Sequence, residues 1–159
     1  MKTSRDHKTP LVDNPIDSTL VYHLLLLINL IAKPFHDNFS KRHSLTLNEW
    51  RIMMTLAHNP GISLSGICEH SGLHIMNVSR GIRRLVRMHR VERSLDPADR
   101  RRSVLRLSDA GAELFNKIAP AALAREDLIR GGLTAREVET FNRLLEKLID
   151  HMRATGADV

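Results

Sequence analysis

Apolar residues recur at intervals of three and four over most of this chain, which is the period of an amphipathic helix. The spacing predicts a first helix that begins at Asp17 or Ser18, continues to about Arg42, and is kinked or broken near Pro34. Its segment 20–32 is strongly apolar but too short to cross a bilayer. We therefore expect this segment to be buried against protein.

A capping box marks the start of the next helix, because Thr46 stands three residues before Glu49. The Thr46 hydroxyl can accept a hydrogen bond from the Glu49 amide, while the Glu49 side chain reaches back. We expect this helix to carry Trp50 toward a core and to end before Asn59-Pro60-Gly61, since proline and glycine do not continue a helix.

Two further helices follow at a short interval. Ser63 can cap a helix over residues 64–70, and a three- or four-residue turn containing Gly72 leads to a helix over residues 74–89. Two helices joined by so short a turn predict a helix-turn-helix.

The second of these helices carries its cations opposite an apolar stripe. The stripe is formed by Val78, Ile82, Leu85 and Val86. The opposite face is free to lie in a DNA major groove, where side chains near the N-terminal end reach base edges. The candidate DNA contacts are Asn77, Ser79 and Arg80 near that end, and then Arg83, Arg84 and Arg87, which either bind phosphates or are merely solvated.

The period changes to two over residues 91–107, around the turn Asp96-Pro97-Ala98-Asp99. This alternation predicts a β-hairpin. Three arginines, Arg100, Arg101 and Arg102, stand at its tip, so the hairpin is a basic wing placed to contact the DNA backbone or a minor groove.

Two helices complete the chain. Ser108 can cap a helix over residues 109–130, which Pro120 should bend, and a second capping box over residues 134–137 starts a last helix that ends near Arg153. The fold class is therefore mainly α, with six helices and one small hairpin.

The charge distribution favours a nucleic-acid partner. The chain has 24 Lys and Arg against 18 Asp and Glu, a formal net charge of +6. Ten arginines and three acidic residues lie between Arg80 and Arg106, so this stretch carries +7 and the remainder −1. Guanidinium groups that neutralise phosphates release condensed counterions, although a solvated arginine-rich face is the alternative explanation.

Sites for other chemistry are weakly supported. The chain has no G-x-S-x-G elbow, phosphate-binding glycine loop or H-E-x-x-H motif, so we expect no enzyme and no cofactor. Cys68, His70 and His74 offer only three metal ligands and cross a helix end, which disfavours a metal site. Cys68 is either a redox-sensing thiol or, more simply, a small core residue. A single cysteine and no secretion signal indicate the cytoplasm, with no membrane partner.

Three segments, LTLNEWRIMMTL, ISLSGICEHSGLHIMNVSRGIRRLV and VERSLDPADRRRSVLRLSDAG, together resemble the MarR family of bacterial regulators over residues 46–111. The wing is the most specific element. Asp99, Arg101 and Leu107-Ser108-x-x-Gly111 are similar to the family's D-x-R-x5-L-T-x-x-G pattern, with Ser108 in place of the usual threonine.

The resemblance implies a homodimer that places two recognition helices in successive major grooves of a pseudo-palindromic operator in double-stranded DNA. By position, Arg101 becomes the arginine that enters a minor groove and Asp99 the acid that orients it. The implied organisation is a flexible N-terminal arm over residues 1–16, a dimerisation helix over 17–44, a winged helix-turn-helix domain over 45–108, and C-terminal dimerisation helices over 109–159.

The resemblance also implies an effector pocket between the first two helices and the dimer interface. Its candidate lining residues, each of which could equally serve ordinary packing, are His23, Phe35, His36, Phe39, Trp50 and Arg51. An arginine beside aromatic rings suits an anionic aromatic ligand, such as a benzoate-like acid. We therefore expect a DNA-binding repressor released by a small aromatic acid. The alternatives are a redox- or metal-responsive regulator and a winged-helix adaptor that binds protein.

Overall fold

The computed structural model describes residues 16–35, 40–96, 99 and 101–156. Within these ranges the chain forms seven α-helices, one 3-10 turn and one two-stranded antiparallel sheet, which confirms the expected mainly α class. The elements are η1 (Ile16–Ser18), α1 (Leu20–Pro34), α2 (Lys41–His43), α3 (Leu47–His58), α4 (Leu64–Ser71), α5 (Ile75–Arg87), β1 (Val91–Leu95), β2 (Ser103–Leu107), α6 (Asp109–Arg130) and α7 (Ala135–Ala154).

α1 ends at Pro34, where a kink or break was expected, and α2 covers Lys41–His43. The described residues therefore contain seven α-helices where six were expected. Helix α1 also begins later than expected, because the N-cap is Thr19 rather than Asp17 or Ser18. The Thr19 Oγ1 accepts a hydrogen bond from Tyr22 N at 3.2 Å, while the two preceding residues belong to the 3-10 turn.

Short polar signals fix the other helix ends where the sequence places them. Both capping boxes form, at the starts of α3 and α7. Ser63 caps α4, which ends at Gly72 in the left-handed conformation with φ 65°. That conformation is open to glycine at little steric cost, and it allows the chain to turn within three residues into α5.

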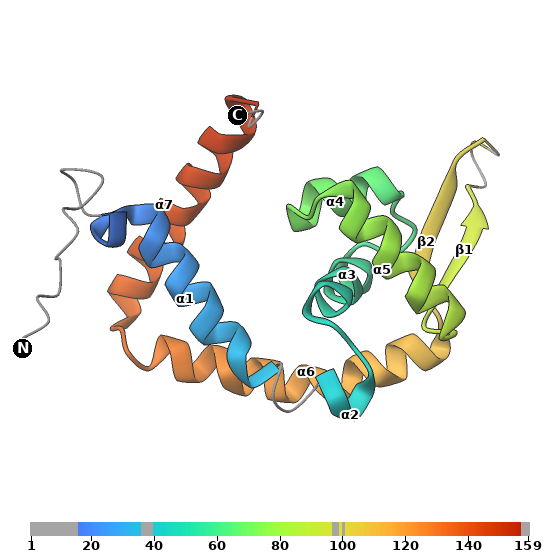
Figure 1. The fold of residues 1–159 in the computed structure, drawn as a ribbon, viewed down its shortest axis with the longest axis horizontal. Helices are drawn as coiled ribbons and strands as arrows, with labels where there is room; N and C mark the ends of the chain where they lie inside the picture. The colour runs from blue at the N-terminus through green and yellow to red at the C-terminus, as the bar shows by residue number, and fades with distance from the viewer. Residues whose placement is uncertain (1–15, 36–39, 97–98, 100, 157–159) are drawn as a thin grey trace, which may run out of the picture.

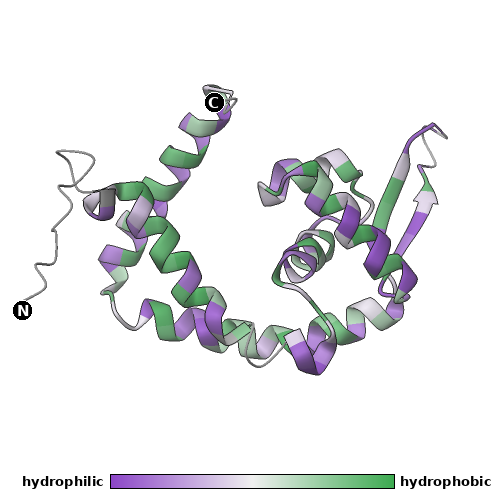
Figure 2. Ribbon diagram, viewed as in Figure 1, coloured by the Kyte–Doolittle hydropathy of each residue, from purple (hydrophilic) through white to green (hydrophobic). Residues whose placement is uncertain are grey.

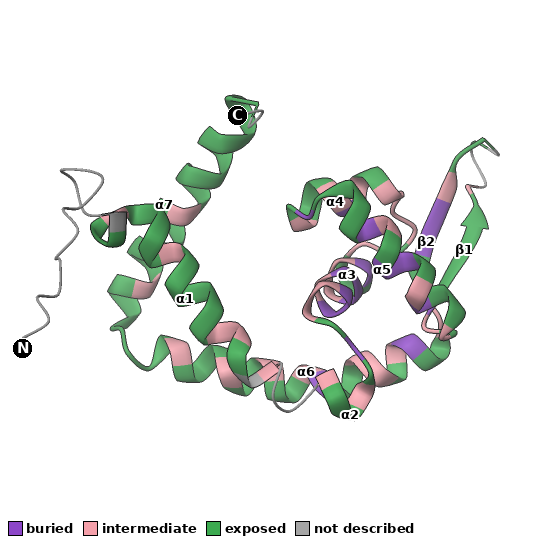
Figure 3. Ribbon diagram, in the orientation of Figure 1, coloured by how far each residue is buried: buried purple, intermediate pink, exposed green. Residues whose placement is uncertain are grey.

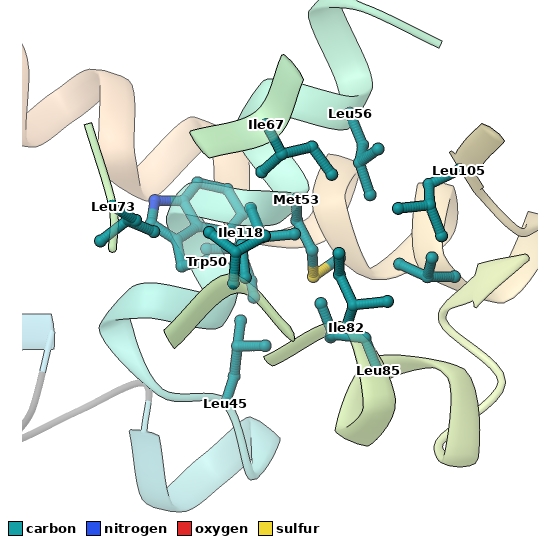
Figure 4. Packing of buried hydrophobic residues seen from close by; sticks show 13 residues of the cluster. Leu45, Trp50, Met53, Leu56, Ile67, Leu73, Ile82, Leu85, Leu105 and Ile118 are labelled. Carbon is teal, nitrogen blue, oxygen red and sulfur yellow. The ribbon is translucent and has the colours of Figure 1, made fainter. Parts of the chain in front are cut away.

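The core lies within the winged helix-turn-helix and is closed by the first half of α6 (Figure 4). Its fully buried side chains come mainly from α3, α4, α5 and β2, and include Ile52, Met53, Leu56, Ile67, Val78, Leu85 and Leu105. Trp50 of α3 stacks on Phe115 of α6, with ring centroids 5.1 Å apart. Ile118, 1% exposed, extends this packing along α6. Helix α6 is therefore attached to the DNA-binding unit through its N-terminal half.

The hairpin is continuous with the core. Its register runs from Val91 opposite Leu107 to Leu95 opposite Ser103. The segment before α4 adds backbone pairing, because Gly61 N donates to Leu105 O and Leu105 N donates to Ile62 O, both at 2.9 Å. These bonds hold the base of the wing against the helix-turn-helix.

Helices α1 and α7 lie on the other side of the molecule, joined to the winged helix-turn-helix by the length of α6 (Figure 1). Helix α1 is apolar along its length, and no described residue of α1 or α7 is buried (Figures 2 and 3). The expected burial of segment 20–32 is thus not met within one chain, since the packed core belongs to the other half. No helix among the described residues is long and apolar enough to cross a membrane.

Candidate functional site

The exposed face of α5 carries polar and basic side chains toward solvent. Asn77, Arg80, Arg83 and Arg87 are all exposed, and Ser79 is half-buried. The stripe behind them is built by Val78, Ile82 and Leu85, which are buried against α3 and the hairpin. Val86, expected in that stripe, is instead exposed at its edge. The buried stripe fixes α5 to the core and leaves its basic face uncovered.

Arg84 departs from the expected solvent- or phosphate-facing position. Its Nη1 donates to both carboxylate oxygens of Glu49, at 2.7 and 2.9 Å, and its Nη2 donates to the carbonyl oxygen of Ser44 at 3.0 Å. The Glu49 residue is only 3% exposed. This arginine therefore joins α5 to the start of α3, and we correct its assignment from a DNA contact to an internal ion pair.

Glu49→Gln is expected to lower the free energy of unfolding by about 2 kcal/mol, because glutamine retains the capping box but leaves the Arg84 guanidinium without its charged partner. Urea unfolding followed by circular dichroism measures this. Glu137→Gln is the matched control, since Glu137 holds the same place in the exposed capping box of α7 and forms no ion pair in the described chain. The interpretation fails if the two variants have the same stability.

A second arginine reinforces the same junction, and the sequence did not single it out. Arg90 Nη2 donates to His43 O at 2.7 Å, and its Nη1 to Ser44 O at 3.4 Å. Burial is the main cause that lowers the pKa of Arg90, and burial together with neighbouring cations lowers the pKa of His43. The carbonyl groups of His43 and Ser44, at the end of α2, thus bind two arginines, one in the last turn of α5 and one just after that helix.

The wing places a further cation in solvent. Arg101 is exposed, and its backbone N donates to Asp99 Oδ1 at 3.0 Å. Asp99 therefore contacts the backbone of Arg101, and its own carbonyl accepts from Arg102 N at 2.9 Å. Arg102 is exposed, whereas Arg100 lies outside the described residues. Arg93, which the sequence did not single out, donates through Nε to Ser103 Oγ at 2.9 Å across the hairpin.

The junction between the wing and α6 contains Leu107-Ser108-x-x-Gly111, and its contacts explain why serine and glycine stand at this spacing. Ser108 Oγ donates to His89 O at 2.6 Å and accepts from Gly111 N at 3.0 Å, so it caps α6 and fixes the end of α5. A Cβ atom at Gly111 would overlap the carbonyl oxygen of Arg90. The spacing of serine and glycine therefore allows the first turn of α6 to lie directly against the backbone that leads into the wing.

A cavity of about 440 Å³ lies between α1, α3 and α6. Three of the expected pocket residues, Phe35, Trp50 and Arg51, line it. His23 is not among the lining residues, and its Nδ1 lies 2.9 Å from Thr19 O at the start of α1. His36 and Phe39 lie outside the described residues.

Helix α6 contributes a wall of this cavity that was not predicted from the sequence. That wall is formed by Ile118, Ala121, Ala122, Arg125, Glu126 and Ile129. The other walls are mostly apolar, and the rings of Phe35 and Trp50 lie 6.4 Å apart at 31°.

Two arginines line the cavity, and each is bonded to a backbone carbonyl on another element. Arg51 Nη2 donates to Ser71 O, at the end of α4, at 2.7 Å. Arg125 Nη2 donates to Leu30 O, in the last part of α1, at 3.1 Å. The cavity is thus in contact with the helix-turn-helix on one side and with α1 on the other.

The cysteine and histidine cluster takes structural positions. No group of three or more His, Cys, Asp or Glu side chains in the described part of the chain could hold a metal ion. His74 is the N-cap of α5, and its Nδ1 accepts from Met76 N at 3.3 Å. Burial raises the pKa of the Cys68 thiol, which reduces its thiolate fraction and hence its reactivity.

A basic helix that follows a tight turn and precedes a paired hairpin defines a winged helix-turn-helix protein, a class that binds DNA. Residues 45–103 match the model of the family described as the MarR family. This match covers less than half of the chain, and the matched segment contains α3, α4, α5 and β1 of the winged helix-turn-helix. The fold of the chain is that of known MarR-family regulators.

Three known proteins illustrate the similarity. The HTH-type transcriptional repressor NicR of Pseudomonas putida is 39% identical over 78 residues, which span 48% of this chain and 49% of NicR, about half its length. A MarR/EmrR family regulator from Acinetobacter sp. ADP1 superposes with a TM-score of 0.81 at 23% identity, over 89% of this chain and 99% of that one. BpsR of Bordetella bronchiseptica, described as regulated in DNA binding by 6-hydroxynicotinic acid, gives 0.77 at 22% identity, over 87% and 99%.

Proposed function

We propose that this chain is a homodimeric repressor that binds a pseudo-palindromic operator in double-stranded DNA and is released by a small aromatic acid. The observation that carries the proposal is the exposed basic face of α5 beside a basic wing, both fixed to one core. The proposed organisation assigns DNA binding to residues 45–108 and dimerisation to the helices of 17–44 and 109–159, preceded by an arm over 1–16.

On DNA, α5 lies in the major groove with its N-terminal end toward the bases. Asn77, Ser79 and Arg80 contact base edges or adjacent phosphates, and Arg83 and Arg87 contact phosphates further along the groove. Arg84 has no part in this interface, because it is bonded to Glu49. The four long polar side chains of this proposed interface are exposed on one face of α5: Asn77, Arg80, Arg83 and Arg87.

The wing contacts the minor groove beside the site of α5. Arg101 enters this groove, and Arg100 and Arg102 add positive charge on either side of it. The hydrogen bond from Arg101 N to Asp99 Oδ1 supports this role, since it fixes the backbone from which the Arg101 side chain projects.

The effector binds in the cavity between α1, α3 and α6. A volume of about 440 Å³ with mostly apolar lining residues fits a one-ring ligand. NicR is named a repressor, and BpsR is described as regulated by an aromatic acid. A ligand that favours one spacing of the two recognition helices shifts the population away from the DNA-binding state. The bond from Arg51 to Ser71 connects the cavity to the turn before α5.

Weaker binding to duplex DNA in Arg80→Ala and Arg101→Ala tests the proposal. Each variant removes one cation per protomer. If that arginine neutralises one phosphate in each half-site, its replacement should make the negative slope of log affinity against log salt less steep, by about two per dimer. Fluorescence anisotropy with DNA from the chain's own genomic neighbourhood measures this over a range of salt. Arg143→Ala, which removes an exposed arginine outside the proposed DNA contacts, is the control once sedimentation equilibrium has shown that it is as dimeric as wild type. Unchanged affinity in the double variant Arg80→Ala/Arg101→Ala contradicts the proposed interface.

A further inference from the structure

We propose that Arg125 of α6 binds the carboxylate of the effector and thereby selects aromatic acids over neutral aromatic molecules. The inference rests on the proposed function, because it assigns the chemistry of the ligand in the same cavity. Arg51 was the arginine expected from the sequence to bind an anionic ligand, whereas the contacts in the cavity favour Arg125.

The position of Arg125 follows from a proline in α1. In a helix the carbonyl of Leu30 would accept from the N–H of residue 34, but Pro34 has no N–H. The Arg125 Nη2 supplies the missing donor, at 3.1 Å from Leu30 O. This bond holds the guanidinium at the wall of the cavity, between α6 and α1. It also uses only one of the two hydrogens of Nη2.

The Nε atom of Arg125 is the second observation. It is buried and has no hydrogen-bond partner, and it is the only buried side-chain nitrogen or oxygen atom of the described residues in this condition. Buried polar groups in proteins are nearly always hydrogen-bonded, so this Nε–H is available to an acceptor that enters the cavity. Nε–H and one of the Nη2 hydrogens lie on the same edge of the guanidinium plane. A carboxylate binds such an edge with two parallel hydrogen bonds.

The remaining charges of the cavity limit the ligand further. Arg51 is already bonded to Ser71 O, and it has no buried nitrogen without a partner. Glu126 is the third charged lining residue, so it would repel a second negative charge on the ligand. The apolar walls include Phe35 and Trp50, which suit the faces of one aromatic ring. The site is therefore built for a planar monocarboxylate.

The experiment compares acids with their amides. Isothermal titration calorimetry on the full chain would use 6-hydroxynicotinic, 4-hydroxybenzoic and 3,4-dihydroxybenzoic acids, each beside its carboxamide. We expect wild-type protein to bind at least one acid about 10-fold or more tightly than the amide. In Arg125→Gln that acid should lose about 10- to 100-fold in affinity, while the amide changes little. Arg51→Gln is the matched control, with a smaller loss for the acid.

Separate outcomes test the two levels of the proposal. Arg125→Lys keeps the charge but not the planar edge of the guanidinium, so we expect it to bind the acid about 10-fold more weakly than wild type. This variant also tests the role of Arg125 if Arg125→Gln does not fold. Retained binding to duplex DNA shows that a variant is folded. If wild-type protein binds an acid and both Arg125 variants bind it equally well, the role of Arg125 is overturned and the proposed repressor stands. If wild-type protein binds none of the acids, the effector class and the role of Arg125 both fall.

Discussion

Gly111→Ala is expected to lower the free energy of unfolding by about 3 kcal/mol or more and to loosen α6 from the wing. The added Cβ atom would overlap the carbonyl oxygen of Arg90, which is backbone and cannot rotate away as a side chain would. Relief requires the first turn of α6 to move. That movement would also break the bonds of Ser108 to Gly111 and His89. Chemical unfolding monitored by circular dichroism measures the loss.

Gly131→Ala is the matched control for this substitution. Gly131 follows the last residue of the same helix with φ −61°, and the nearest atoms to an added Cβ are helix carbonyl oxygens at 3.4 and 3.5 Å. Alanine fits there in ordinary contact, so we expect stability close to that of wild type. If Gly111→Ala is as stable as Gly131→Ala, the close approach of α6 to the wing is not needed for folding.

The sequence predicted most helix boundaries because they depend on hydrogen bonds between residues three apart. Thr46 with Glu49 and Thr134 with Glu137 form the expected reciprocal pairs. The start of α1 was placed one or two residues early because consecutive residues there can all cap a helix. Local rules do not choose among them, whereas the structure uses Thr19.

Contacts between distant residues account for what the sequence did not predict. Helical periodicity correctly put Arg84 on the polar side of α5, but Glu49, 35 residues earlier, turns this arginine inward. The contact of Arg125 with Leu30 spans 95 residues and depends on the proline at the end of α1. No periodicity in α6 indicates a missing donor in another helix. The wall of the cavity was therefore the least predictable part of the candidate site.

The same contacts reduce the electrostatic footprint that composition suggests. Among the ten arginines between Arg80 and Arg106, Arg84, Arg90 and Arg93 are bonded to groups of the protein. Arg80, Arg83, Arg87, Arg101, Arg102 and Arg106 remain exposed. The number of phosphates that the protein neutralises sets how steeply DNA binding weakens with salt. We expect this number to be set by the smaller group of exposed arginines together with Arg100, and not by all ten arginines of the stretch.

Leu25→Glu is expected to convert the protein to a monomer and to reduce operator affinity by about 100-fold or more. Leu25 lies in the middle of the apolar helix α1 and is 56% exposed in the single chain. Several neighbouring apolar residues of α1 are also exposed. In the proposed homodimer this surface is covered, so one substitution places a charge on each side of the two-fold axis and buries both at high cost. A monomer contacts one half-site at a time and loses the high effective concentration that links the two. Sedimentation equilibrium and anisotropy on the same samples measure both effects. Glu92→Lys, a larger change of charge at an exposed position of β1 and outside the proposed dimerisation helices, should leave the dimer intact, whereas a dimeric Leu25→Glu protein would show that α1 is not the interface.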